Sequence, residues 1–143
     1  MRSKFIFFVI LSFLIVPIIS FAGGYKSKRP GRKGYLKGDS IDKDRINIYD
    51  RNSSRKGYLK QDWFFKDRTY IYDRNGQKKG YLKKDWLNKD QTNIYGKEGN
   101  RKGHLKQDRL YKERTNIFNK DGYRKGYLKE DPIFNDRTDI FKN

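Results

Sequence analysis

The chain has 143 residues, enough for one domain, and carries 35 Lys and Arg against 17 Asp and Glu, a net charge of +18. It has no cysteine, which excludes disulfides and a lipid-modified N-terminal cysteine, and its one histidine gives no basis for a zinc site. High charge and low hydropathy are typical of disordered chains, but 11 Tyr, 10 Phe and 2 Trp that recur in phase indicate a folded one.

Residues 1–22 have the pattern of a secretory signal peptide. Two basic residues precede an apolar run over 5–19, and Ser20 and Ala22 occupy the −3 and −1 positions of a cleavage site. An uncleaved membrane anchor is the alternative, but the run is short for a membrane-spanning helix, which needs about 20 apolar residues. We expect export to a periplasm or the cell exterior, with no stable membrane span after cleavage. The leader holds two of the 35 cations, so the mature chain would carry 33 against 17 acids, a net charge of +16.

After a short basic linker at 23–31, one motif returns every 23 residues without an insertion or deletion. The copies in the predicted domain, 32–143, are 32–54, 55–77, 78–100, 101–123 and 124–143. Each copy contains a Lys-Gly-x-Leu-Lys segment and an x-x-Ile-aromatic segment. Both segments have the composition of short β-strands.

In chain order the elements are a lone strand at 34–36, hairpins over about 47–60, 70–83, 93–106 and 116–129, and a lone strand at 139–141. The two lone strands complete a fifth hairpin only by pairing with each other. Such pairing closes a ring and removes exposed sheet edges. We therefore predict an all-β fold, a small closed propeller-like ring of five antiparallel hairpins joined by the N- and C-terminal strands. An open β-solenoid or meander is the alternative.

Asn75-Gly76 predicts a two-residue type I′ turn, and the other copies have similar pairs. This register places Ile71 opposite Gly80 and on the same face as Leu82, so that an aliphatic row lies on one face and the tyrosines lie on the other. We expect the recurring glycine either to allow a neighbouring element to approach closely or to mark a β-bulge.

The link between the two strands of a copy is polar with one apolar residue, such as Phe64 or Leu87. We expect this residue to pack under the aliphatic face. The recurring acids could suggest calcium, but no Asp-x-Asp-x-Asp-Gly loop is present. Turn capping by Asp39 and its equivalents, with local ion pairs, is the favoured interpretation.

The run Ile-Tyr-Asp-x-x-Gly-x-x-x-Gly-Tyr-Leu, from Ile71 to Leu82, resembles bacterial tandem β-hairpin repeats of the YD and WG types and small β-flower proteins. The resemblance covers the whole mature chain. Gly-Tyr replaces the Trp-Gly of the WG repeats, and lysine is denser here. The resemblance implies an exported or surface-exposed scaffold and offers no catalytic residue to carry over.

The residue types of nucleophilic catalysis are missing. Cysteine is absent, and His104 occupies the position that tyrosine fills in the other four copies, which favours an aromatic packing role over a general base. We predict no enzyme activity, no catalytic or metal-binding residue and no cofactor, with a hydrolase as the remaining alternative.

The predicted outer face interleaves tyrosines with lysines, and two tryptophans lie in the links. Aromatic rings beside cations can stack on sugars while the cations meet phosphate or carboxylate. The candidate ligand-binding residues are Lys60, Trp63, Tyr70, Tyr72, Lys78, Lys79, Tyr81, Lys83 and Trp86. They predict multivalent binding of an anionic envelope polymer, such as a glycan or lipopolysaccharide. A structural or protein-interaction scaffold is the alternative, and nucleic acid is not the expected partner because no nucleic-acid-binding signature is present.

Overall fold

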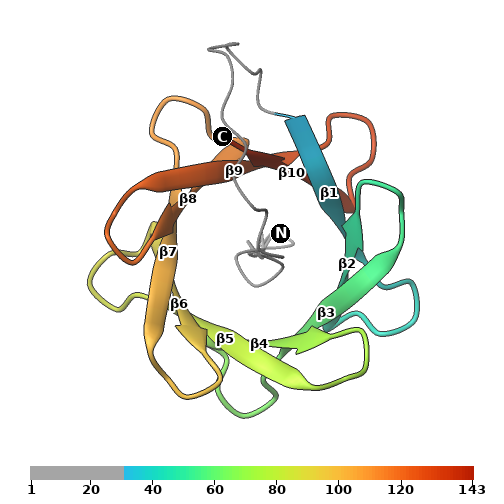
Figure 1. The fold of residues 1–143 in the computed structure, drawn as a ribbon, viewed down its shortest axis with the longest axis horizontal. Coiled ribbons are helices and arrows are strands. Elements are labelled where there is room, and N and C mark those ends of the chain that lie inside the picture. Colours follow the sequence, from blue (N-terminus) through green and yellow to red (C-terminus); the bar gives the residue numbers. More distant parts are fainter. Residues whose placement is uncertain (1–30) are drawn as a thin grey trace, which may run out of the picture.

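The computed structural model describes residues 31–143. All regular secondary structure in this part of the chain is β-strand (Figure 1). The strands are β1 (Gly31–Gly38), β2 (Arg45–Asp50), β3 (Arg55–Gln61), β4 (Arg68–Asp73), β5 (Lys78–Lys84), β6 (Gln91–Gly96), β7 (Arg101–Gln107), β8 (Arg114–Asn119), β9 (Arg124–Glu130) and β10 (Arg137–Lys142). The predicted signal peptide and all but the last residue of the basic linker lie outside the described residues. Within 31–143, no helix is long and apolar enough to cross a membrane.

The ten strands form one closed barrel, in which each strand pairs antiparallel with the next and β1 pairs with β10 (Figure 1). The two strands that the sequence leaves without a hairpin partner therefore complete the fifth hairpin. This confirms the predicted closed ring and excludes the open solenoid or meander. Strands of adjacent hairpins, such as β3 and β4, are also paired, so the hairpins join into one continuous barrel wall.

The core is a ring of ten aliphatic side chains on the inner face of the barrel. They are Leu36, Ile48, Leu59, Ile71, Leu82, Ile94, Leu105, Ile117, Leu128 and Ile140, none more than 7% exposed. Leucine and isoleucine face each other across neighbouring strands, as Leu59 and Ile71 do. Full burial of one such side chain contributes about 1.5–3 kcal/mol, so this ring is a major stabilising term. The predicted aliphatic face is confirmed.

The tight turns differ from the predicted two-residue type. Gly76 N donates to the Asp73 carbonyl at 3.1 Å, and Asp73 N donates to the Gln77 carbonyl at 2.9 Å, which closes a three-residue loop. Gly76 has φ +78° while Asn75 has no positive φ, so the turn is type I followed by a glycine bulge. A type I′ turn would require positive φ at both residues. Ser53, Gly99 and Gly122 take the place of Gly76 in the other turns.

A second irregularity restores the predicted register on the core face. The three-residue loop shifts the pairing by one residue, so Tyr72 lies opposite Lys78. A bulge then inserts Lys79, and Ile71 lies opposite Gly80 as predicted. The same shift recurs beyond the other three turns and where β1 meets β10. The inner register was therefore predicted correctly although the turn type was wrong.

The recurring glycine follows the bulged residue and also contacts the next strand closely. A Cβ atom added at Gly103 would overlap the carbonyl oxygen of Phe118, and the equivalent overlap occurs at the glycine of every other copy. Both predicted reasons for this glycine, a bulge and a close approach, are confirmed.

The apolar link residues do not pack under the aliphatic face, which corrects that prediction. Phe64 and Leu87 are each 68% exposed. The reason is local: the Asp62 carboxylate accepts hydrogen bonds from the backbone N–H groups of Phe64 and Phe65, at 2.8 and 3.0 Å. These bonds fix the link in a tight loop that directs its apolar side chains away from the barrel interior.

Replacing Gly103 with Ala should destabilise the barrel by about 1–3 kcal/mol, the usual cost of overpacking, because the Phe118 strand must move. Gly38→Ala is the matched control, since no atom lies within 4 Å of its added Cβ. Urea unfolding of both variants measures the difference. Equal stability of the two variants would show that the close approach does not constrain the barrel.

Candidate functional site

The outer wall of the barrel carries five stacked aromatic pairs, one in each repeat. They are Tyr35–Tyr49, Tyr58–Tyr72, Tyr81–Tyr95, His104–Phe118 and Tyr127–Phe141, with ring centroids 4.8–4.9 Å apart. His104 therefore packs as the aromatic member of its repeat, as its position predicts. Burial lowers the pKa of His104, and Arg101 and Lys106 lower it further.

Arginines cover the outer faces of most of these pairs. The guanidinium carbons of Arg45, Arg68, Arg114 and Arg137 lie 3.9–4.9 Å from the ring centroids of Tyr58, Tyr81, Tyr127 and Tyr35. Each of these tyrosines is thus held between a cation and a second ring, an arrangement that stabilises the wall. Rings covered on both sides leave little face for a sugar to stack on.

The nine predicted ligand-binding residues do not form one surface. The structure brings together Tyr70, Tyr72 and Tyr81. The ring centroid of Tyr70 lies 6.4 Å from that of Tyr72 and 6.3 Å from that of Tyr81. Lys78 joins them, with Nζ 3.9 Å from the Tyr70 ring. These contacts are internal to the wall, so they support packing of the tyrosines.

The other predicted residues are separated from this cluster. Lys60 and Lys83 pair with Asp42 and Asp67 of the links at 3.0 and 3.9 Å, and Lys79 pairs with Asp73 at 3.0 Å. Trp63 and Trp86 project from two different links and are 82% and 84% exposed. The links and the tight turns lie at opposite ends of the strands, so Lys79 and the tryptophans belong to different ends of the barrel.

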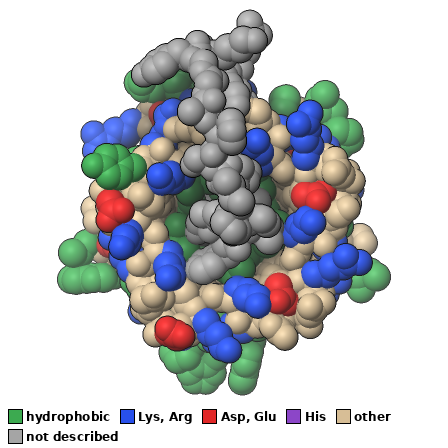
Figure 2. All heavy atoms as spheres, in the orientation of Figure 1, with side chains coloured by type: hydrophobic (Ala, Val, Ile, Leu, Met, Phe, Trp, Pro, Cys, Tyr) green, Lys and Arg blue, Asp and Glu red, His purple; other side chains and the backbone are tan. Residues whose placement is uncertain are grey.

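One end of the barrel is strongly positive. This cationic rim consists of the tight turns with the strand residue before each and the strand start after it, 50–56, 73–79, 96–102 and 119–125, together with Arg32 and Lys33. It holds fourteen Lys and Arg, against four acids: Asp50, Asp73, Glu98 and Asp121. Figure 2 shows an end of the ring on which Lys and Arg side chains outnumber the acidic ones.

The cationic rim is uneven around the ring. Its recurring lysine is paired in two copies, Lys56 with Asp50 at 3.2 Å and Lys79 with Asp73 at 3.0 Å. At the position of these aspartates the other three copies have Gly96, Asn119 and Lys142. Among the described residues, no ion pair involves the lysines of these copies, Lys33, Lys102 and Lys125.

Asn119 keeps the structural role of the aspartate without its charge. The Asp73 carboxylate accepts hydrogen bonds from the N–H groups of Asn75 and Gln77, both at 2.9 Å. The Asn119 side-chain oxygen accepts from Asp121 and Tyr123 in the same way, at 3.1 and 2.8 Å. The turn is capped in both cases, but only the aspartate neutralises a nearby lysine. Sequence reasoning missed this rim, although a basic-Lys-Gly triplet in every copy marks it.

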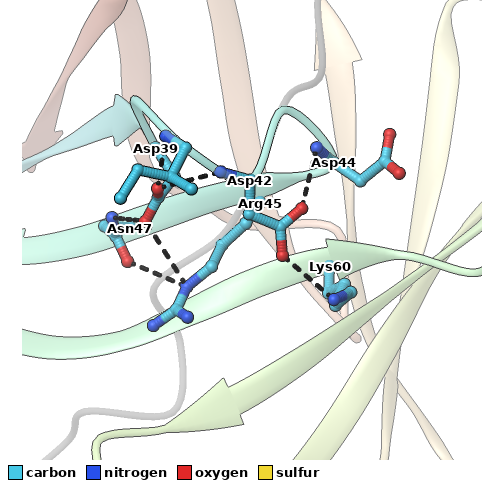
Figure 3. A network of polar contacts seen from close by, with 7 residues as sticks. Asp39, Asp42, Asp44, Arg45, Asn47 and Lys60 are labelled. Carbon is cyan, nitrogen blue, oxygen red and sulfur yellow. Dashed lines mark hydrogen bonds and ion pairs between the residues drawn. The ribbon is translucent and has the colours of Figure 1, made fainter.

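At the other end, each link is organised around one aspartate, as Figure 3 shows for the first copy. Asp39 accepts from the N–H groups of Ile41 and Asp42, at 3.0 and 3.1 Å, and from the Asn47 amide at 2.9 Å. The Ile41 N–H, then Asn47 and Asp42, lower the pKa of Asp39 from its ordinary value of 3.8 to about 2. Arg45 adds to this effect.

The equivalent aspartates repeat this geometry. Asp62, Asp85, Asp108 and Asp131 each accept two backbone N–H groups two and three residues ahead, and their pKa values are all lowered. The predicted turn-capping role of these acids is confirmed. In the described part of the chain, no group of three or more His, Cys, Asp or Glu side chains is arranged to hold a metal ion.

A small cavity of about 150 Å³ opens beside the links. Its lining includes Leu82, Leu105, the threonines Thr69, Thr92 and Thr115, and charged residues of two links. Its lining contains no Ser, Cys or His, so it offers threonine, carboxylate and lysine groups but no nucleophile–histidine pair.

The capping aspartates predict a defined acid limit of stability. Because their pKa values are lowered in the folded state, the unfolded chain binds more protons in acid. The contribution of Asp39 should therefore be complete above pH 3.8 and decline as the pH falls toward about 2, and that of the four equivalent aspartates should also be lost as the pH falls below 3.8. Thermal unfolding between pH 2 and 6 measures this decline. Asp85→Asn with Asp108→Asn keeps the acceptor oxygens and should flatten it, whereas an unchanged pH profile would contradict the role of these carboxylates.

The comparisons with known proteins leave the function to be argued from this geometry. No protein-family model matches the chain, and no match was found among curated proteins or solved structures. The resemblance to YD, WG and β-flower repeats therefore stays a prediction.

Proposed function

We propose that this protein is an exported, non-enzymatic module that binds an anionic polymer, such as an envelope glycan, through the cationic rim. One observation carries the proposal: fourteen Lys and Arg are gathered at one end of the barrel against four acids. A charge excess of this size exceeds what solubility requires of a small domain. It also concentrates a polyanion at one end of the molecule.

The circular arrangement suits a long and flexible ligand. Each repeat contributes two or three cations, so a polymer that follows the rim meets equivalent sites in succession. Weak contacts in series give avidity without any strong single contact. Each contact also releases counterions from the polymer, which makes binding depend steeply on salt.

The sector from β6 round to β1 is the part of the rim best suited to hold the polymer. There the recurring lysines Lys102, Lys125 and Lys33 face no aspartate, so an incoming anion does not displace an internal partner. Tyr123 lies in the same sector and is 69% exposed. This ring, which the sequence analysis did not select, can stack on a sugar beside Arg124 and Lys125.

A pair of matched variants tests this assignment. Lys102→Gln with Lys125→Gln removes two lysines that make no ion pair in the described residues, and Lys56→Gln with Lys79→Gln removes two that are already paired. On immobilised heparin, the first variant should lower the slope of log affinity against log salt by about two, the value for two lost contacts. The second variant should lower it less, because its lysines are already neutralised.

Neutral dextran is the control polymer, and wild-type binding to heparin should weaken as salt rises toward ~0.5 M, where charges are screened beyond a few ångströms. Absence of retention, or retention that salt does not change, would favour the alternative of a scaffold with no polymer ligand.

A further inference from the structure

The link end of the barrel exposes a ring of large apolar side chains, which we name the apolar crown. The most exposed large apolar residue of each link is Ile41, Trp63, Trp86, Leu110 or Ile133, with 78–91% of its surface exposed. A second large apolar residue follows in four of the links. Single exposed apolar residues are common on proteins, but a recurring set at one end marks an interaction surface.

The crown is a regular structure. The links have equal length and join strands of equal register, so the in-phase residues Ile41, Phe64, Leu87, Leu110 and Ile133 lie at one level along the barrel axis, and Trp63 and Trp86 each come one residue before this position. Figure 2 shows hydrophobic side chains projecting beyond the ring around its circumference. The aspartate caps fix each link, as Asp108 does by accepting from Leu110 and Tyr111 at 3.0 and 3.2 Å. The apolar side chains are therefore presented in fixed positions.

Five acids of the links, Asp39, Asp42, Asp67, Asp131 and Asp136, form ion pairs with cations of the strands. The five links hold eleven acids and five cations. Asp42 and Asp67 pair with Lys60 and Lys83 on the wall, at 3.0 and 3.9 Å. The caps Asp39 and Asp131 lie 3.8 and 3.5 Å from the Nε atoms of Arg45 and Arg137. Ion pairs with the wall thus compensate five of the eleven negative charges behind the crown.

A lysine accompanies the crown in four of the five links: Lys43, Lys66, Lys89 and Lys112. Each comes two or three residues after the most exposed apolar residue of its link. Tryptophan and other aromatic residues with a nearby lysine are typical of the boundary between lipid headgroups and acyl chains. A long lysine side chain can reach the headgroups while its neighbour is buried in lipid.

We infer that the apolar crown docks the protein onto a lipid bilayer surface, with Trp63, Trp86 and the exposed apolar residues of the other links inserted among the headgroups. The flat partner follows from the geometry. Separate apolar side chains at one level meet a planar surface together, whereas a protein partner would need a matching pocket for each. Residues 31–143 hold 30 Lys and Arg against 17 acids, so anionic lipid attracts the barrel as a whole. This inference goes beyond polymer binding and uses the opposite end of the barrel.

Intrinsic fluorescence tests the inference directly, because both tryptophans of the chain lie in the crown. On addition of phosphatidylcholine vesicles containing phosphatidylglycerol, the emission should shift to shorter wavelength. Lipids brominated near the headgroup end of the acyl chain should quench it. Leu110→Ser with Ile133→Ser keeps both reporters and should weaken vesicle affinity by about tenfold or more, the loss expected when two apolar side chains no longer enter lipid.

The matched control is Lys102→Gln with Lys125→Gln, which alters the cationic rim and should leave the tryptophan shift in place. Vesicle binding without a tryptophan shift would overturn the inference, because the lipid would then contact another surface. A shift that appears with protein concentration in the absence of vesicles would also overturn it, since a second copy would then cover the crown. Circular dichroism verifies that both variants keep the barrel.

Discussion

The pairing of β1 with β10 is the constraint on which the other features depend. Residues 31–143 hold one sheet, no helix and no disulfide, so no other element of this part of the chain covers a sheet edge or the aliphatic face. Closure covers both at once: it pairs the two edge strands and turns ten leucine and isoleucine side chains into a common core. The equal length of the repeats makes this possible, because each hairpin then contributes the same rotation around the axis.

Closure also separates two chemistries. In a ring of identical hairpins, every link lies at one end and every tight turn lies at the other. Any residue type that recurs at a fixed position in the repeat therefore becomes a ring at one end of the barrel. The basic-Lys-Gly triplet becomes the cationic rim, and the apolar link residue becomes the apolar crown. A barrel of this size can thus meet two partners of unlike chemistry without either site hindering the other.

The sequence predicted the closed ring, the core face and its register, because these depend on a period of two and a repeat of 23 residues. Prediction from the sequence failed where local hydrogen bonds determine the conformation of a turn or link. Asn75-Gly76 favours a type I′ turn, but the bulge at Lys79 makes a three-residue loop compatible with the same core register. Phe64 was expected inside, but the Asp62 cap turns its link outward. The ion pair between Lys60 and Asp42 spans 18 residues, and it becomes visible only once the strands are placed.

The repeats are equal in backbone and unequal in side-chain chemistry, and the differences are informative because the fold does not require them. Gln91 stands where the other four copies have an arginine that covers a tyrosine ring. On the strand paired with that of Gln91, His104 replaces this tyrosine, so the arginine is missing in the copy where it would cover an imidazole. Asn119 stands where two copies have aspartate, and it caps its turn equally well. Either residue accepts the two backbone N–H groups of the turn, so the cap does not require a negative charge there. The asparagine leaves Lys125 without a counter-charge on one side of the rim, which is the property that a site for an external anion needs.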